Sequence, residues 1–267
     1  MLVIGEKLTG MFKAARAAIE SRDKAALQGI ARAPLEAGAD VLDLSLGTAQ
    51  VEPLPAMRWC VETIRELTPA PLAIDTTKPD LMEEGLRLAG PGSFINSTTG
   101  QEEKLQTYLP LAVRYDASLI ALTIDEKGVP ADAAGRAEIA LRIVAGAMEA
   151  GLDPQRLYID PVILPVKFMQ PTGGHVLSAL REMRLLCDPP PKTVLGLSNV
   201  SQATTKRELI NRTFLIMSLA AGLDAAIVDP LDRELMQAMI TAELLLNRHI
   251  YCDDFLKAYR AGERASP

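Results

Sequence analysis

The amino-acid sequence predicts an α/β fold, a single-domain (β/α)8 TIM barrel that spans residues 1–267. Eight short apolar runs of β character recur along the chain, helical segments separate them, and no Pro-, Gly- or Ser-rich linker divides the sequence. Alternating strands and helices form parallel sheets, and eight such units close into a barrel of roughly 250 residues. An open doubly wound sheet is the alternative, but GEKLTGMF, after the first strand, does not match the GxGxxG phosphate loop typical of such sheets.

The eight predicted strands are nearly continuous apolar runs, as expected for parallel strands that are covered on both faces. In chain order they are LVIGE (2–6), VLDLSLG (41–47), PLAIDTT (71–77), SFINSTT (93–99), LIALTID (119–125), LYIDPVI (157–163), KTVLGLSN (192–199) and AAIVDP (225–230).

Residues that typically begin or end helices lie between these strands. The phrases AGAD and AGLD precede the second, sixth and eighth strands, and their glycines are expected to end helices. The expected helices are 25–40 ending at Gly38, 78–90 with Pro79 in its first turn and an end near Gly90, 134–153 ending at Gly151, 212–224 ending at Gly222, and closing helices within 231–262. Capping boxes are predicted at Thr99–Glu102 and Thr205–Glu208.

Composition and charge exclude several classes of protein. The net charge of −6 offers no basic footprint for nucleic acid, and no apolar run reaches the roughly 18 residues of a membrane span. The first residues lack signal-peptide features, so we expect a cytoplasmic protein. Cys60, Cys187 and Cys252 form no CxxC pair and are expected to be buried free thiols. The two histidines belong to no HExxH motif, so we expect no intrinsic metal.

Polar residues mark the end of every predicted strand, where a barrel places its active site. Part of this set is expected to cap helices or to satisfy loops. Asp43, Asp75, Asn96 and Asp160 stand out because each directly follows Leu or Ile, and a buried carboxylate needs a partner. The full set is Glu6, Asp43, Ser45, Asp75, Thr77, Asn96, Asp125, Asp160, Ser198, Asn199 and Asp229.

Carboxylates and amides without His or Cys do not form a nucleophilic triad, and no lysine ends a strand as a Schiff-base nucleophile would. Such groups suit a flat heterocycle that presents N–H donors and a carbonyl, such as a 2-amino-4-oxo-pyrimidine edge. Two structural alternatives stay open on the residues alone: Asp75 could cap a helix, and Asn199 could satisfy a turn.

Four motifs carry a resemblance to a known family: INSTTG (95–100), IDPVILPV (159–166), PKTVLGLSNVSQ (191–202) and LINRTFL (209–215). With them the chain resembles the methyltetrahydrofolate:corrinoid protein methyltransferases along nearly its whole length. These are pterin-binding barrels related to dihydropteroate synthase and to the folate module of cobalamin-dependent methionine synthase.

The resemblance implies a role for each site residue. Asp75, Asn96 and Asp160 would hold the pterin ring together with Asp43, and Asn199 would be catalytic, beside the ring nitrogen that carries the methyl group. A neutral amide can donate a hydrogen bond to that nitrogen as it becomes the leaving group, without an internal charge to desolvate. Other expected pocket residues are Gly196, Ser198, Gln202 and, at the edge, Arg207.

The chain departs from the family pattern at two positions. Relatives often read Asp-Ser-Thr-Asn where this chain reads DTTK (75–78), and often carry Asn where it has Ser45. Lys78 could meet the folate glutamate, the corrinoid partner or only solvent. We expect His175 to lie in the long loop after the sixth strand.

Three functions are carried forward from the resemblance: methyl transfer between (methyl)tetrahydrofolate and a corrinoid, a dihydropteroate-synthase-type condensation, and folate binding without catalysis. Strand eight ends IVDPLDR, without the basic residue that the synthase usually carries there. No DxHxxG corrinoid loop is present, so a partner protein must supply the corrinoid. The resemblance also implies a homodimer. Methyl could flow toward cobalt, as in acetogenesis, or toward tetrahydrofolate, as in O-demethylation.

Overall fold

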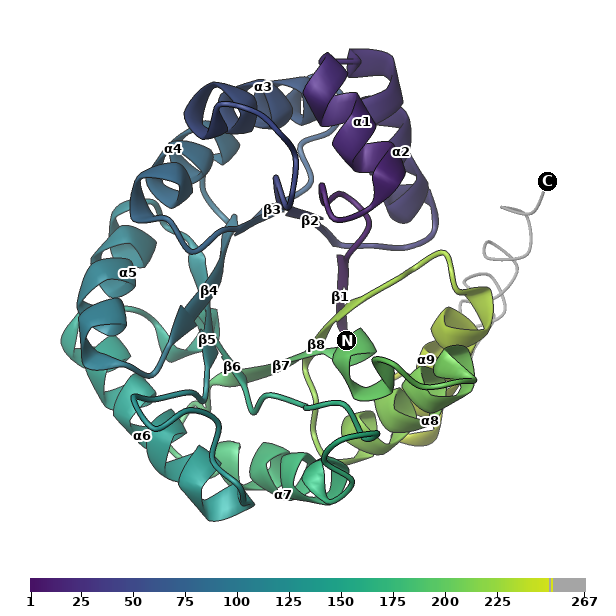
Figure 1. The fold of residues 1–267 in the computed structure, drawn as a ribbon. Helices are drawn as coiled ribbons and strands as arrows, with labels where there is room; N and C mark the ends of the chain where they lie inside the picture. The colour runs from purple at the N-terminus through teal and green to yellow at the C-terminus, as the bar shows by residue number, and fades with distance from the viewer. Residues whose placement is uncertain (250, 252–267) are drawn as a thin grey trace.

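A computed structural model describes residues 1–249 and 251. Its centre is a closed barrel in which each of eight parallel strands pairs with its neighbours and β1 pairs with β8 (Figure 1). The predicted (β/α)8 barrel is therefore confirmed. The strands are β1 (Leu2–Gly5), β2 (Val41–Leu44), β3 (Leu72–Asp75), β4 (Phe94–Thr99), β5 (Ser118–Leu122), β6 (Leu157–Asp160), β7 (Lys192–Gly196) and β8 (Ala225–Val228).

The helices form an outer ring around these strands (Figure 1). The first connection carries two helices, so the described chain has one helix more than a minimal barrel needs. They are α1 (Lys13–Ser21), α2 (Lys24–Glu36), α3 (Pro53–Arg65), α4 (Pro79–Ala89), α5 (Glu102–Arg114), α6 (Ala133–Glu149), α7 (Thr172–Met183), α8 (Arg207–Ala220) and α9 (Arg233–Leu245). Two short 3-10 helices complete the set, η1 (Pro154–Arg156) and η2 (Leu197–Ser201).

The glycine stop signals are confirmed, whereas the capping boxes are wrong. Gly38, Gly151 and Gly222 have φ values of 99°, 81° and 106°, a backbone conformation that side chains with a Cβ rarely adopt. Thr99 cannot cap α5 because it is still part of β4, and Gln101 occupies the N-cap position. The N-cap of α8 is Lys206 in a left-handed conformation, one residue after the predicted Thr205.

The end of the predicted seventh strand, residues 192–199, is also wrong. β7 ends at Gly196, and the chain turns at once into η2, which carries Ser198 and Asn199. His175 lies in the first turn of α7, not in a loop. Of the predicted closing helices, α9 lies within 231–262, but residues 250 and 252–267 are outside the described part, as are Cys252 and the predicted domain boundary at 267.

Cys60 and Cys187 are free thiols; Cys60 is buried as expected, whereas Cys187 is partly exposed. Across residues 1–249 and 251, the structure contains no helix that is long and apolar enough to span a membrane.

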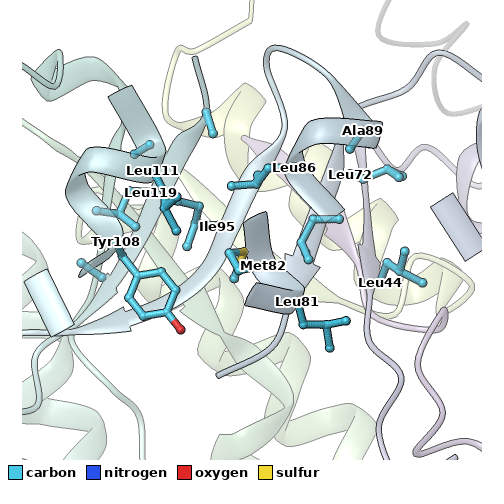
Figure 2. Packing of buried hydrophobic residues seen from close by; sticks show 14 of the residues in the cluster. Leu44, Leu72, Leu81, Met82, Leu86, Ala89, Ile95, Tyr108, Leu111 and Leu119 are labelled. Atoms are coloured by element: carbon cyan, nitrogen blue, oxygen red, sulfur yellow. The ribbon is translucent and has the colours of Figure 1, made fainter. Parts of the chain in front are cut away.

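Two apolar layers stabilise the barrel. The outer layer lies between strands and helices, where Leu72 and Ile95 from the sheet meet Met82 and Leu86 of α4 (Figure 2). The inner layer fills the barrel itself, and each of its seven core members comes from a different strand. They are Ile4, Val41, Ala73, Phe94, Ile120, Val194 and Ala225.

Strand geometry then determines what lies above the inner layer. Side chains alternate between the two faces of a strand, so the residue two positions after an inward-facing residue also faces inward. Strands that carry an inner-layer residue therefore aim their next inward residue at the carboxyl-terminal mouth of the barrel.

Candidate active site

The inward residues at the barrel mouth form a polar layer directly above the apolar interior. Each lies two positions after an inner-layer residue or an apolar residue packed against that layer, which places it on the same face of its strand. The layer consists of Glu6, Asp43, Asp75, Asn96, Asp160, Gly196 and Asp229. The structure thus brings together the four polar residues that the sequence predicted from their apolar context.

Asp43 and Asn96 form the most buried pair of this layer. The Asn96 Nδ2 donates to Asp43 Oδ1 at 2.8 Å, and the two residues are 8% and 6% exposed. Asp75, the last residue of β3, is directly opposite Asn96 in the β3–β4 register. The bond to Asp43 occupies one amide hydrogen of Asn96, so the Asn96 side-chain oxygen remains available as an acceptor.

Asp160 ends β6 and is held by backbone groups on both sides. Its Oδ1 accepts from the Val162 N–H at 2.7 Å, and its Oδ2 accepts from the Gly196 N–H at 3.2 Å. These bonds fix the orientation of the carboxylate while the lone pairs that they leave unused can accept from a ligand.

The Asn199 amide lies above Gly196. A Cβ added to Gly196 would be 3.0 Å from Asn199 Nδ2, so the absence of a side chain there leaves room for the amide. Asn199 is exposed, and within residues 1–249 and 251 its side chain makes no protein hydrogen bond. The amide is therefore available to a ligand at the mouth.

Ser198 and Arg207 take part in a hydrogen-bond network beside this layer, and Gln202 does not. Ser198 Oγ donates to Glu6 Oε2 at 3.0 Å. Arg207 Nε donates to the buried Ser201 Oγ at 3.1 Å, and its Nη2 donates to the Ser198 carbonyl at 3.3 Å. Gln202 follows η2 as an exposed residue whose N–H donates to the Asn199 carbonyl.

Burial and mutual repulsion make the mouth carboxylates weak acids. The pKa of Asp43 is raised chiefly by burial and then by the charge of Asp75. Burial also raises the pKa of Asp75 and of Glu6, with Ser45 and Ser198 respectively acting in the opposite direction. For Asp160, burial raises the pKa to about 6, although the bonds from Val162 and Gly196 lower it. Part of this acidic layer is therefore ready to take up protons near neutral pH.

Other predicted strand-end residues have structural roles. Asp125 accepts from the Lys127 N–H at 2.9 Å and pairs with Arg142 at 3.0 Å, away from the layer. Asp229, although a member of the layer, is paired with Lys7 at 2.8 Å. Lys78 is the exposed N-cap residue of α4 and lines, with Ser45 and Asp75, a cavity of about 380 Å³ beside the mouth. Within the described part of the chain, no group of three or more His, Cys, Asp or Glu side chains could hold a metal ion.

Sequence reasoning placed Glu6 at a strand end but left it out of the candidate site, and it missed Ser201 and Arg136. Glu6 could have been included, since it follows Ile4 by two residues as the other members follow their inward neighbours. Ser201 and Arg136 carry no such signal, because contacts between segments far apart in the sequence define their surroundings.

The geometry offers a row of acceptors inside the mouth and one uncommitted amide at its rim. Asp75 and Asp160 can accept from N–H groups of a flat ring, and the Asn96 oxygen can accept another. Asn199 can donate to an acceptor on the same ring or accept from a donor.

Comparison with known proteins finds relatives along nearly the whole chain. A family model described as a pterin-binding enzyme matches residues 9–229. Over 265 residues the chain is 31% identical to the methylcorrinoid:tetrahydrofolate methyltransferase of Eubacterium limosum, which covers 98% of this chain and 97% of the relative. It is 29% identical over 241 residues to the methionine synthase of Mycobacterium tuberculosis, where the match covers 85% of this chain but only 20% of the larger protein.

Solved structures agree on the fold. The DHPS of Yersinia pestis bound to a pterine-sulfa conjugate superimposes with a TM-score of 0.68 at 17% identity, covering 93% of this chain and 94% of that one. A dihydropteroate synthetase solved with a product gives the same TM-score at 15% identity. The barrel, its polar mouth and the match over residues 9–229 lead to one conclusion: the chain belongs to the family of pterin-binding enzymes.

Proposed function

We propose that this protein is a methyltransferase that moves a methyl group between N5 of tetrahydrofolate and the cobalt of a corrinoid carried by a partner protein. The observation that carries the proposal is the acceptor layer of Asp75, Asn96 and Asp160 below the uncommitted Asn199 amide. The relative with 31% identity over nearly the full length of both chains has a name that joins these two substrates.

The acceptor layer would recognise the pterin ring. Its 2-amino-4-oxo edge presents N–H donors, which Asp75 and Asp160 would accept while Asn96, held by Asp43, contributes its oxygen. Gly196 leaves space for the Asn199 amide beside the ring, and Ser198 with Arg207 stabilises the adjoining wall. Deep burial of these groups would make ring recognition specific, because an unmatched polar group there is costly.

Asn199 would act on the ring nitrogen during transfer. When methyl leaves N5, the carbon–nitrogen bond breaks and its electron pair stays on nitrogen, which then accepts more strongly. A hydrogen bond from Asn199 Nδ2 strengthens at that moment and lowers the barrier. The reverse reaction passes through the same transition state, so the same amide serves transfer from methyl-cobalt to tetrahydrofolate.

We favour the direction from methylcorrinoid to tetrahydrofolate, as the name of the Eubacterium limosum relative states for that enzyme. In this direction N5 of tetrahydrofolate forms the new bond to carbon, the N5 proton is released, and cobalt keeps the electron pair as Co(I). The corrinoid arrives as a substrate on a separate protein. The functional unit would be a homodimer in the cytoplasm.

Methyl transfer in vitro tests this function. The purified protein, methylcobalamin and tetrahydrofolate should yield methyltetrahydrofolate and cob(I)alamin, followed by cobalt absorbance under anaerobic conditions. Absence of transfer with intact folate binding would leave folate binding without catalysis. Condensation of a dihydropterin pyrophosphate with p-aminobenzoate would favour the synthase alternative.

Substitutions of site residues test whether the folate binds at the barrel mouth. Asp75→Ala should weaken methyltetrahydrofolate binding by more than ~1 kcal/mol, the scale for an unmatched polar partner. Asp125→Ala is the matched control, since this carboxylate pairs with Arg142 outside the layer. Equal affinities of the two folded variants in calorimetric titration would contradict the assignment of Asp75 to the ring.

A further inference from the structure

Arg136 is a buried cation near the site that the proposed chemistry does not use. It lies in the first turn of α6 and is only 1% exposed, the largest fully buried side chain among the described residues. Its Nε donates to the Pro161 carbonyl at 2.7 Å and its Nη1 to the Asp132 carbonyl at 2.9 Å. Burying a guanidinium costs free energy, and the acceptors that Arg136 has among the described residues are backbone carbonyls, with no carboxylate paired to it.

The bond between Arg136 and the Pro161 carbonyl connects Arg136 to the site residue Asp160. The Pro161 carbonyl and the Val162 N–H belong to the same peptide group. Arg136 binds that group at its oxygen, and Asp160 Oδ1 binds it at its N–H, at 2.7 Å. The three groups therefore form one continuous chain: cation, peptide dipole, carboxylate.

The conformation of Val162 supports the importance of this chain. Its φ is 61°, in the left-handed region that a β-branched residue strongly disfavours. This strained residue directly follows the peptide carbonyl that Arg136 binds, and its own N–H donates to Asp160. Contacts around the turn must offset the local strain, and the Arg136 bond to Pro161 is one of them.

We propose that Arg136 is a positioning residue that orients and polarises Asp160 through the Pro161–Val162 peptide group. This inference rests on the proposed function, in which ionised Asp160 accepts from the pterin ring. A cation at the carbonyl end of a peptide strengthens the N–H donor at the other end, because hydrogen bonds in a chain polarise one another. The polarised N–H favours the charged form of Asp160.

The other groups around Asp160 leave this role to Arg136. Thr123 fixes the backbone of Asp160, since its N–H and hydroxyl donate to the Asp160 carbonyl at 2.9 and 3.2 Å. Gly196 supplies a neutral N–H to the carboxylate. The acids of the surrounding elements are Asp132 before α6, and Glu6, Asp43 and Asp75 across the mouth, while burial is the main cause that raises the pKa of Asp160.

The test is the pH dependence of methyltetrahydrofolate affinity, measured by calorimetry from pH 5 to 8. In the wild type, affinity should fall as pH decreases through about 6, where Asp160 takes up a proton. In Arg136→Met the fall should begin at higher pH, by on the order of one pH unit, with several-fold weaker binding at pH 6.5. Arg136→Lys, which keeps a charge and one donor, should lie between them. At saturating folate and pH 8, kcat should change little.

Arg65→Met is the matched control. Arg65 also uses its guanidinium only on backbone carbonyls, those of Thr68, Ala70 and Ala89, at the opposite end of the barrel. It should lower the melting temperature as Arg136→Met does, but leave the pH midpoint in place. A folded Arg136→Met with the wild-type midpoint overturns the inference; if that variant does not fold, an unchanged midpoint in Arg136→Lys does so. Wild-type protein that binds no folate at any pH overturns the proposed function instead.

Discussion

The Asn199 amide lies next to Gly196, and its side chain makes no hydrogen bond to another residue of the described chain. Its Nδ2 stands 3.0 Å from where a Cβ of Gly196 would be, and Gly196 in turn donates its N–H to Asp160. The Asn199 amide and the Asp160 carboxylate are thus joined through a single residue. A ligand that contacts both is held at two points that the backbone keeps at a fixed separation.

Replacing Asn199 tests whether its amide contributes to folate affinity or to the rate of methyl transfer. If the amide acts mainly on the transition state, Asn199→Ala should slow single-turnover methyl transfer by ~10–1000-fold and weaken folate binding much less. Asn199→Asp keeps the shape but loses the donor and should be similarly slow. Cobalt absorbance gives the rate and calorimetry the affinity, with Thr205→Ala as a control in the same segment.

Two results would contradict this role. A loss of affinity as large as the loss of rate would make Asn199 a uniform binding residue. An unchanged rate would leave its position explained by the turn alone.

At the scale of elements, the junction between β7 and η2 places the proposed catalytic amide of Asn199 directly after the end of the strand. Gly196 is the last residue of β7, with φ −72° and ψ 80°, a conformation open to residues other than glycine. Glycine is needed there for space, because the next element folds back over it.

A side chain at this junction should therefore affect activity more than stability. Gly196→Ala should displace the Asn199 amide by a few tenths of an ångström and slow methyl transfer by roughly 3–30-fold, since small misplacements reduce rates strongly. Gly29→Ala, at an exposed position of α2 with nothing within 4 Å of the new Cβ, is the control. It should keep the rate and gain up to ~1 kcal/mol of stability. Equal rates of the two variants would contradict the junction's role.

Sequence patterns predicted the elements well where local chemistry determines them. The helix ends at Gly38, Gly151 and Gly222 were predictable because each depends on the positive φ of the glycine itself. The strands were predictable because each is a short, nearly continuous apolar run, and four polar residues at the strand ends were predictable because each interrupts such a run directly after Leu or Ile. The capping boxes failed because the end of β4 and the turn before α8 depend on neighbours, and no local signal reveals the contact between Arg136 and Pro161.

For the whole molecule, the acidic mouth opposes stability. Asp43 has a folded-state pKa above its unfolded value, chiefly through burial, and the same holds for Asp75 and Glu6. The stability that such groups contribute is complete below the unfolded pKa, near ~3.9, and is lost as pH rises through the folded pKa. Retaining these acids at neutral pH therefore costs free energy of folding.

Asp43→Asn should relieve that cost. Its amide oxygen can still accept from Asn96, so the variant should exceed wild type at pH 8 by on the order of 1 kcal/mol, with the difference shrinking toward pH 4. Asp125→Asn should instead be less stable than wild type at both pH 5 and pH 8, because Lys127 and Arg142 hold the pKa of Asp125 below its usual range and its contribution is lost only at lower pH. Urea unfolding at pH 5 and pH 8 measures both. Asp43→Asn no more stable than wild type at pH 8 would contradict the prediction.

The proposed homodimer is also a property of the whole molecule. The resemblance that motivates it agrees with the general prevalence of twofold assemblies. Light scattering at micromolar concentration should give twice the chain mass of 28.8 kDa, and a species of the single-chain mass would contradict the dimer.

The location of the acceptor layer within strands has an evolutionary consequence. Glu6, Asp43, Asp75, Asn96 and Asp160 all belong to the barrel strands or directly follow one, so loops, which generally vary most among homologous proteins, do not hold them. Loops around the mouth can then diverge, lengthen or be exchanged while the recognised ring stays the same. One ancestral barrel could in this way have acquired a succession of protein partners without ever losing its small-molecule substrate.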